Sequence, residues 1–355
     1  MLGLNFKDKN LKIVEKFWIF LIISAVIIVA GLVDTFFVRN MNLGVEFSGG
    51  SNIEVSVGVS EFDQNDFETA VKNWLGGDRD GDGKVETKAY EVDGNVQKSG
   101  ADLSTFSFRI GMTMVEDGKT IDLNSDPDST GEILLVTENE EIKKELKLFI
   151  EEYFENKATV EVETHVISDD VKNYTVRNAF IAVAVAVVVI LIYIALRFNL
   201  LAGISAIVAL LHDVLIMIAF TTIFQIPVNM TFIAAVITIV GYSINATIVV
   251  FDRIREIHAL PSNVDKTDVE IANEAISSTL TRSIITTLTT LVMIVALAIF
   301  GSTAIREFAF PIIFGLLAGA YSSVLLSAPL WVKLRKLFGQ ENKKPSKKAK
   351  KAKQA

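Results

Sequence analysis

The chain has 355 residues, of which 50% are hydrophobic and 21% are charged, and its net charge at pH 7 is -8. Its mean hydropathy of +0.42 is too high for a soluble domain of this length, which excludes a purely soluble protein. The charged residues must therefore be concentrated outside the apolar segments, as in a membrane protein with a soluble part. The absence of cysteine excludes disulfides, thiolate catalysis and cysteine metal sites.

Six apolar segments predict six transmembrane helices. The first, at residues 17–38, is long enough to cross roughly 30 Å of hydrocarbon and follows a short basic N-terminus at residues 1–16. No small-residue cleavage site follows it, so we expect a membrane anchor and not a cleaved signal peptide. The other five spans fall within residues 175–337, at 179–196, 200–224, 228–251, 284–300 and 308–332.

The distribution of Lys and Arg predicts the orientation in the membrane. Because cytoplasmic loops carry the excess of basic residues, the sides on which they gather should be cytoplasmic. With six alternating spans, one side receives the following basic residues near span ends: Lys7, Lys9, Lys12, Lys16, Arg197, Arg253, Arg255, Lys333, Arg335 and Lys336. We therefore expect both termini in the cytoplasm and residues 39–174 outside it.

The charge is unevenly divided along the chain. Residues 39–174 hold 30 acidic and 13 basic residues, a balance of about -17. Residues 338–355 contain seven lysines and no apolar residue larger than Ala after Phe338, so we expect a disordered tail. We interpret this tail as a positive-inside signal with affinity for anionic lipid, and favour this over nucleic-acid binding.

The outer segment alternates strand and helix patterns, which predicts a compact α+β domain. Strands are expected at 52–57, 85–92, from 96 onward, at 103–110 and at 159–166, with a hairpin turn at Asp93-Gly94. Helices are expected from Ser60 and Asp63 to Trp74, and from a Thr137 to Glu140 capping box to Phe154. This order is typical of a ferredoxin-like fold.

The connection at residues 252–282 is longer and more polar than the other connections between spans. It carries apolar residues at near-helical spacing, namely Val269, Ile271, Ala272, Ala275 and Ile276. We expect this cytoplasmic loop to contain an amphipathic helix lying along the membrane surface.

Polar residues inside two spans are the main candidates for function. His212-Asp213 lies well inside the third span, about 14 to 16 residues from Arg197 and roughly 20 Å from the cytoplasmic end. Burial favours the uncharged form of an Asp, so the pair could relay a proton or an ion, or it could form a structural hydrogen bond. Ser243 and Asn245 in the fourth span have the same two interpretations, since buried hydroxyl and amide groups also join packed helices.

Arg282 begins the fifth span at the start of a polar stripe. Thr286 and Thr289 follow it at positions i+4 and i+7, on one helical face. A lone Arg at this depth can extend its side chain to the headgroups, but such a long polar face favours a helix interface or a hydrated groove. We expect Asn245 to approach Arg282 across the bundle.

A partial calcium loop stands out in the outer segment, whereas enzyme motifs do not. Asp78, Asp80 and Asp82 alternate before Gly83, and Glu86 occupies the ninth loop position, but Ala89 replaces the bidentate Glu of the twelfth. Weak Ca²⁺ binding and a solvated acidic hairpin are the two interpretations. Gly118-Lys119-Thr120 lacks the leading glycine of a phosphate loop, and the three His do not share ligand spacing, so we expect no enzyme activity.

Four motifs together resemble the SecF family of protein translocase subunits, within the resistance-nodulation-division superfamily. They are the segments 43–50, 212–213, 241–256 and 280–285. The first is typically Gly-Ile-Asp-Phe-Thr-Gly-Gly in this family; here it is Gly44, Val45, Glu46, Phe47, Ser48, Gly49 and Gly50. The fourth-span motif typically has Asp where this chain has Ala246.

The resemblance implies half of a resistance-nodulation-division transporter: a six-helix membrane bundle with an inserted extracytoplasmic α+β domain, in the bacterial cytoplasmic membrane. It implies SecD as heterodimer partner, and action with SecYEG, and with YajC or YidC-type subunits, on exported unfolded polypeptides. The proton-motive force is the energy source that the family implies, and Arg282 matches its functional Arg in the fifth span.

Ala246 places direct proton carriage by the fourth span in question. An engineered or natural loss, a shift of the proton to Asp213, and reliance on carboxylates of the partner are the three explanations. Two other functions stay open: an exporter half for lipids or small molecules, and a scaffold of the translocase without energy coupling.

Overall fold

The structure is a computed structural model that describes residues 11–58, 62–78, 88–99, 105–116, 118–123, 134–155 and 158–341. It divides into two compact units, one of residues 1–41, 181–226 and 231–355, and one of residues 42–180 and 227–230. The predicted tail at 338–355 lies outside the described residues beyond residue 341.

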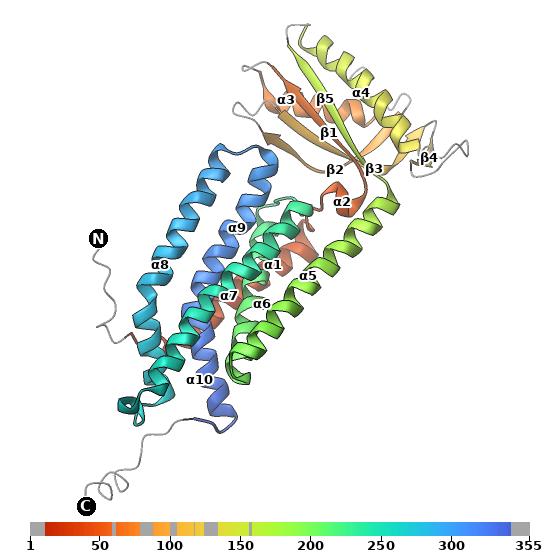
Figure 1. Cartoon of the computed structure of the whole chain (residues 1–355). Helices are drawn as coiled ribbons and strands as arrows, with labels where there is room; N and C mark the ends of the chain where they lie inside the picture. Colours follow the sequence, from red (N-terminus) through yellow and green to blue (C-terminus); the bar gives the residue numbers. More distant parts are fainter. Residues whose placement is uncertain are drawn as a thin grey trace, which may run out of the picture. The chain divides into compact units, whose positions relative to one another are not determined.

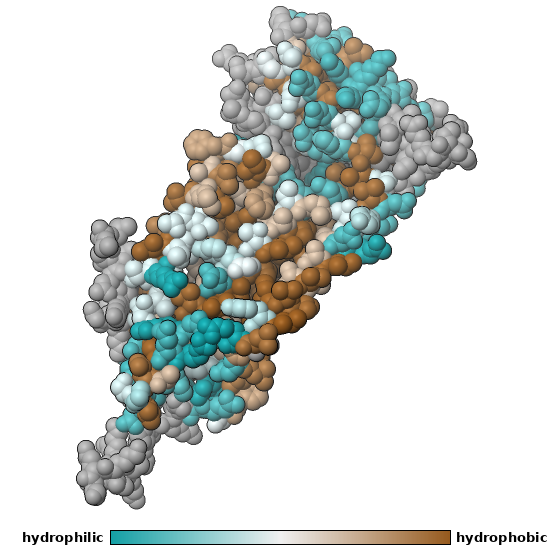
Figure 2. Space-filling view, in the orientation of Figure 1, coloured by the Kyte–Doolittle hydropathy of each residue, from teal (hydrophilic) through white to brown (hydrophobic). Residues whose placement is uncertain are grey.

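The first unit is a bundle of long apolar helices (Figure 1). Among the described residues, six helical segments are long and apolar enough to cross a membrane: Val14–Val38, Asp170–Ile194, Leu200–Ile223, Met230–Ala259, Asp268–Phe300 and Ala304–Leu337. The elements that form them are α1 (Phe17–Val33), α5 (Asp169–Arg197), α6 (Leu200–Ile223), α7 (Met230–Ala259), α8 (Asp268–Phe300), α9 (Thr303–Ser322) and α10 (Ala328–Leu337). Hydrophobic side chains cover much of the outward surface of these helices (Figure 2).

Short segments of other helical types extend these helices. The 3-10 turns η1 (Val14–Lys16) and η3 (Pro261–Asn263) precede α1 and separate α7 from α8. The π-helices η2 (Asp34–Val38) and η4 (Ser323–Ser327) extend α1 and join α9 to α10. Asp34 is buried and its carboxylate pairs with Arg39 at 3.0 Å, so an ion pair lies at the C-terminal end of the first span.

The prediction of a surface helix in the loop 252–282 is wrong, because this stretch forms the end of one long helix, a short turn and the start of the next long helix. Residues up to Ala259 continue α7, and α8 begins at Asp268 behind a Thr267–Glu270 capping box. The apolar residues of this stretch are buried in the core of the bundle and not on a membrane surface. Asn273 fixes them there, since its Oδ1 accepts hydrogen bonds from the backbone N–H of Ile13 and Val14, both at 3.1 Å.

The second unit is an antiparallel sheet with two helices packed on one face (Figure 1). Its strands are β1 (Gly50–Val57), β2 (Lys88–Ser99), β3 (Thr105–Glu116), β4 (Lys119–Asp122) and β5 (Val160–Ile167), in the order β2-β3-β1-β5 with β4 paired to β3. Its helices are α2 (Val45–Ser48), α3 (Gln64–Leu75) and α4 (Leu134–Tyr153). The connectivity β1-α3-β2-β3-α4-β5 is that of a ferredoxin-like fold, which confirms the predicted α+β class.

Alternation along the strands separates a core face from a polar face. Ile53, Val55 and Val57 of β1 and Phe106 and Phe108 of β3 are buried against α3 and α4. Residues between them, such as Glu54 and Ser107, lie on the other face. At α3, Asp63 is the N-cap and accepts from the backbone N–H of Asn65 and Asp66.

Two local predictions in this unit are wrong. Asp93-Gly94 lies inside the continuous strand β2, where the register with β3 shifts between Asp93 and Gln97, so the turn residues form a bulge and not a hairpin. Helix α4 is already formed at Leu134, so Thr137 lies within it and does not cap it.

Candidate functional site

Asp213, near the middle of α6, is the centre of a buried polar cluster. Its side chain is fully buried, and it accepts hydrogen bonds from hydroxyl groups on two other helices. Ser243 Oγ on α7 donates to Oδ2, and Ser322 Oγ at the end of α9 donates to the same oxygen at 2.8 Å. His212 Nδ1 lies 2.9 Å from Oδ1. One carboxylate therefore joins α6, α7 and α9.

Glycine residues let α9 come close enough to α7 for these bonds. A Cβ at Gly319 would lie 3.1 Å from Ser243 Cβ, and one at Gly315 would lie 2.5 Å from Ile239 Cγ1, so the glycines of α9 pack directly against α7. Ser322 is the last residue of α9 and lies directly before the π-helix η4, and π-helical turns are frequent at functional sites. Pro329 near the start of α10 lacks the N–H that a regular helix would use there.

His212 connects Asp213 to an apolar cavity. Its ring stacks on Tyr321, with centroids 6.0 Å apart, and the Tyr321 hydroxyl donates to the carbonyl of Phe20 at 2.6 Å. Its Nε2 is buried and has no hydrogen-bond partner among the described residues. The cavity beside it has a volume of about 370 Å³ and is lined by α1, α6 and α9, including Ser24, Phe220 and Phe314.

The cluster can accommodate both charge states of Asp213. A hydroxyl group both donates and accepts, so Ser243 and Ser322 can donate to a carboxylate or turn to accept from a carboxylic acid. A bond between His212 Nδ1–H and Asp213 leaves Nε2 as the acceptor on the cavity side. Loss or gain of one proton here would change hydrogen bonds to three helices at once, which is the requirement for coupling a proton to helix movement.

The predicted coupling residues are divided between two sites on opposite sides of α7. Ser243 faces Asp213, whereas Asn245 and Ala246 line a separate small pocket of about 60 Å³ with Arg282 on α8. The structure thus brings Asn245 and Arg282 to one pocket, together with Thr286. Arg282 is exposed, and its guanidinium has no hydrogen bond or ion pair within the described part of the chain.

The glycine motif of residues 44–50 forms the entry into β1. Gly44 N–H donates to the Val228 carbonyl at 2.8 Å, which links the motif to the loop between α6 and α7. Glu46 and Phe47 lie in the single turn of α2, and both are partly exposed. Gly49 and Gly50 have φ of 79° and 99°, and a Cβ at Gly50 would lie 2.2 Å from the Ile110 carbonyl oxygen. Gly50 is therefore required by the backbone approach of β1 to β3.

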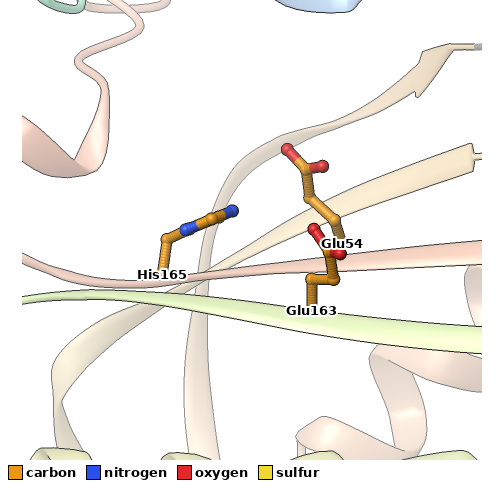
Figure 3. Close-up of side chains that lie close together, drawn as sticks. All are labelled: Glu54, Glu163 and His165. Carbon is orange, nitrogen blue, oxygen red and sulfur yellow. The ribbon is translucent and has the colours of Figure 1, made fainter.

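Of the four residues predicted to bind calcium, Asp78 lies within the described residues, whereas Asp80, Asp82 and Glu86 lie outside them. A different carboxylate group forms on the polar face of the sheet, where Glu54 of β1 is directly opposite Glu163 of β5. His165 lies two residues farther along β5, and one ligand atom of each side chain lies within 4.8 Å of the others (Figure 3). Glu163 and His165 are exposed and Glu54 is half-buried. Sequence spacing could not reveal the group because it depends on the pairing of two strands more than 100 residues apart.

Three residues of the Asp213 cluster were missed in the sequence: Gly319, Tyr321 and Ser322. Tyr321 and Ser322 carry no pattern of their own, because hydroxyl groups are common in transmembrane helices. A detectable signal was the spacing of small residues in the sixth span, Gly315, Gly319 and Ser323, which is typical of close helix packing.

The chain matches known families over both of its units. Residues 148–337 match the family "Protein export membrane protein SecD/SecF, C-terminal", and residues 36–60 match the "SecD/SecF GG Motif". Protein translocase subunit SecF of Calditerrivibrio nitroreducens is 30% identical over 91% of this chain and 93% of its own length. Protein translocase subunit SecF of Borreliella burgdorferi is 30% identical over 89% of this chain and 94% of its own length.

Longer relatives contain this chain as a part. Protein translocase subunit SecDF of Bacillus subtilis is 33% identical over 92% of this chain, which spans 38% of that protein. The crystal structure of SecDF, a translocon-associated membrane protein from a Thermus species, has a TM-score of 0.68 and 25% identity, and covers 93% of this chain and 39% of that chain. With six helices able to span a membrane in its described part, the chain is a multi-pass membrane protein and belongs to the SecD/SecF family of protein export membrane proteins.

Proposed function

We propose that this chain is the SecF-type half of a SecD–SecF complex that assists protein export by using the proton-motive force. The observation that carries the proposal is the buried carboxylate of Asp213, which is hydrogen-bonded from α7 and α9. In the proposed cycle a proton reaches Asp213 from one side of the membrane and leaves toward the other. Each transfer alters the bonds that hold α6, α7 and α9 together, and the outer α+β domain moves in response.

The partner in this proposal is SecD, docked on the face formed by α7 and α8. Two features support it: SecDF relatives match this chain over about two fifths of their own length, and Arg282, which lines a small pocket, has no ion-pair partner among the described residues. Thr286 and Thr289 extend the polar stripe along α8 and are exposed in the isolated chain. A carboxylate on the partner would pair with Arg282, the role that the Asp of the family motif would otherwise have at Ala246.

SecYEG, with YajC or YidC-type subunits, and exported unfolded polypeptides are the further partners that we propose. Both termini are cytoplasmic in this proposal, because the Lys and Arg residues gather at one set of span ends. Two ligand proposals are separate from the cycle: weak Ca²⁺ binding by residues 78–86 and contact of the Lys-rich tail with anionic lipid.

Gradient-driven export in vesicles tests this function. Vesicles would contain the chain, SecD and the SecYEG channel, and export of an unfolded precursor would be measured with and without an imposed proton gradient. Asp213→Asn should remove the stimulation by the gradient while co-purification with SecD stays normal. Asp34→Asn is the matched control, because Asp34 is a buried acid that is paired with Arg39 at a helix end. Full stimulation in Asp213→Asn would assign proton handling to SecD.

A second candidate function rests on the apolar cavity beside His212. A volume of about 370 Å³ is near the lower end of ligand pockets, and its walls would suit a lipid tail or a small apolar molecule as transported substrate. Efflux of a lipophilic dye from the same vesicles, driven by the gradient without a precursor protein, would favour this exporter function over protein export.

A further inference from the structure

A second cavity of the bundle, of about 270 Å³, is rich in arginine. It lies where α5 ends, α6 begins and α7 ends, with α10 along its side. Its lining includes Arg197, Arg255, Arg335 and His258. Hydrophilic side chains gather at the end of the bundle at which α7 ends (Figure 2). We call this cavity the arginine pocket.

The carboxylates beside the arginine pocket do not neutralise it. Arg197 NH2 lies 2.9 Å from Asp252 Oδ1, and Arg255 NH2 lies 3.2 Å from the same oxygen, so two guanidinium groups share one carboxylate. Arg335 has its own partner, Asp268, at 2.9 Å. Among the ion pairs of the described residues, three guanidinium groups thus face two carboxylates, which gives an excess of one positive charge before His258 is considered. The N-terminus of the 24-residue helix α6 begins at the same cavity and adds its positive dipole end.

The interior of the arginine pocket is apolar. Phe251 and Ile254 of α7 and Trp331 of α10 line it, and all three are buried. The Arg335 guanidinium lies 5.1 Å from the centre of the Trp331 ring, so part of the cationic rim stacks on the apolar wall. A small soluble anion would use the rim and leave the wall in contact with water. An anion attached to a hydrocarbon chain would use both.

We propose that the arginine pocket binds the phosphate of an anionic phospholipid. Because four membrane-spanning segments begin or end around the pocket, it lies at the depth of the lipid headgroups. The phosphodiester lies against Arg255, whose side chain is 56% exposed. It gives Arg255 an anion of its own, in addition to the Asp252 carboxylate that Arg255 shares with Arg197. The glycerol and the first acyl carbons lie against Phe251 and Trp331. Basic pockets between transmembrane helices commonly hold lipid headgroups in this way.

Arg255→Gln tests the proposal with little risk to folding, because the Arg197–Asp252 pair remains. Arg253→Gln is the matched control: Arg253 is two residues away on α7, bonds Ser278 and Glu256, and does not line the pocket. The full chain would be placed in nanodiscs of phosphatidylcholine with increasing phosphatidylglycerol, and retained lipid would be counted by native mass spectrometry. We expect one tightly retained phosphatidylglycerol, about tenfold weaker in Arg255→Gln and unchanged in Arg253→Gln, since one charge-assisted hydrogen bond is worth about this factor.

Two further arms separate the alternatives. Inorganic phosphate is added to protein in pure phosphatidylcholine discs; if it protects Arg255 from chemical modification as well as phosphatidylglycerol does, the ligand is a soluble phosphate and the lipid proposal is wrong. A chain without residues 343–355 should retain the lipid, because the Lys-rich tail is a separate basic segment. Equal loss in Arg253→Gln and Arg255→Gln would also overturn the proposal, since it would show a general effect of surface charge.

Discussion

Gly319 is the position at which one added methyl group should disturb the Asp213 cluster most directly. A Cβ at this position would lie 3.1 Å from Ser243 Cβ and 3.2 Å from Ser243 Oγ, closer than ordinary van der Waals contact. Ser243 is 1% exposed and its hydroxyl donates to Asp213, so it has no free space to move into. In Gly319→Ala, either the hydroxyl leaves its hydrogen-bonding position or α9 moves away from α7.

The size of the effect follows from three contributions. Adding a carbon to a well-packed helix contact costs about 1–3 kcal/mol. Weakening a hydrogen bond to a charged or chargeable carboxyl costs up to about 1.5–3 kcal/mol if the bond is lost entirely. Replacing Gly by Ala inside a helix stabilises the folded state by about 0.4–1 kcal/mol. We therefore expect a net destabilisation of about 2 kcal/mol, since the packing term is only partly offset and the hydrogen bond is stretched more than broken.

Gly241→Ala is the matched control, because Gly241 on α7 has nothing within 4 Å of its would-be Cβ. Thermal unfolding of the full chain in detergent should show a lower Tm for Gly319→Ala and an unchanged or slightly higher Tm for Gly241→Ala. The same two variants in the vesicle export assay should differ in their response to the gradient, with Gly319→Ala impaired. Equal Tm and equal export in the two variants would refute the argument that α9 is held against Ser243 at this contact.

Three more predictions concern other parts of the chain. Burial lowers the pKa of Lys88, but its hydrogen bonds to Glu141 and the buried Glu138 outweigh this and hold the pKa above the usual 10.5. The stabilisation by these bonds is therefore present at neutral pH and is lost as the pH rises beyond 10.5. The Tm difference between wild type and Lys88→Met should shrink above that pH. Millimolar Ca²⁺ should raise the Tm of the full chain, and Asp80→Ala should remove this shift; no shift in wild type would favour the solvated hairpin. Ala246→Asp should be tolerated or improve gradient-driven export, because Arg282 lines the same pocket and can pair with the new carboxylate; an assembled but inactive variant would contradict this.

The architecture of both units was predictable because its signals are local and periodic. Strand alternation in 52–57 and 159–166 corresponds to β1 and β5 within one or two residues, and the apolar runs mark all six helices able to cross a membrane. The wrong predictions concern segments whose structure is determined by contacts with residues far away in the sequence. Asp93-Gly94 has a hairpin sequence, but β3 is 12 residues long and pairs with β2 on both sides of it. The stretch around Ile271 looks amphipathic, yet the N-terminal segment and α10 bury it.

The candidate site could be found only in part. His212 and Asp213 stand out because ionisable residues are rare in apolar spans. Their partners Tyr321 and Ser322 are more than 100 residues away along the chain, and no periodicity connects them. The arginine pocket shows the same limit, since its arginines were visible as orientation signals but not as one cavity with Trp331.

Helix α7 separates two polar sites that differ in how completely this chain supplies them. On one side Ser243 donates to the carboxylate of Asp213, which has further hydrogen-bond partners on α6 and α9. On the other side Ala246 and Arg282 face an exposed pocket in which a positive charge has no counter-charge among the described residues. An exposed arginine tolerates this in water but not in hydrocarbon, where an unpaired charge costs several kcal/mol. The face of α7 and α8 must therefore meet water, headgroups or a partner's carboxylate, and the proposed SecD partner is the one that would also supply the acid that this chain lacks at Ala246.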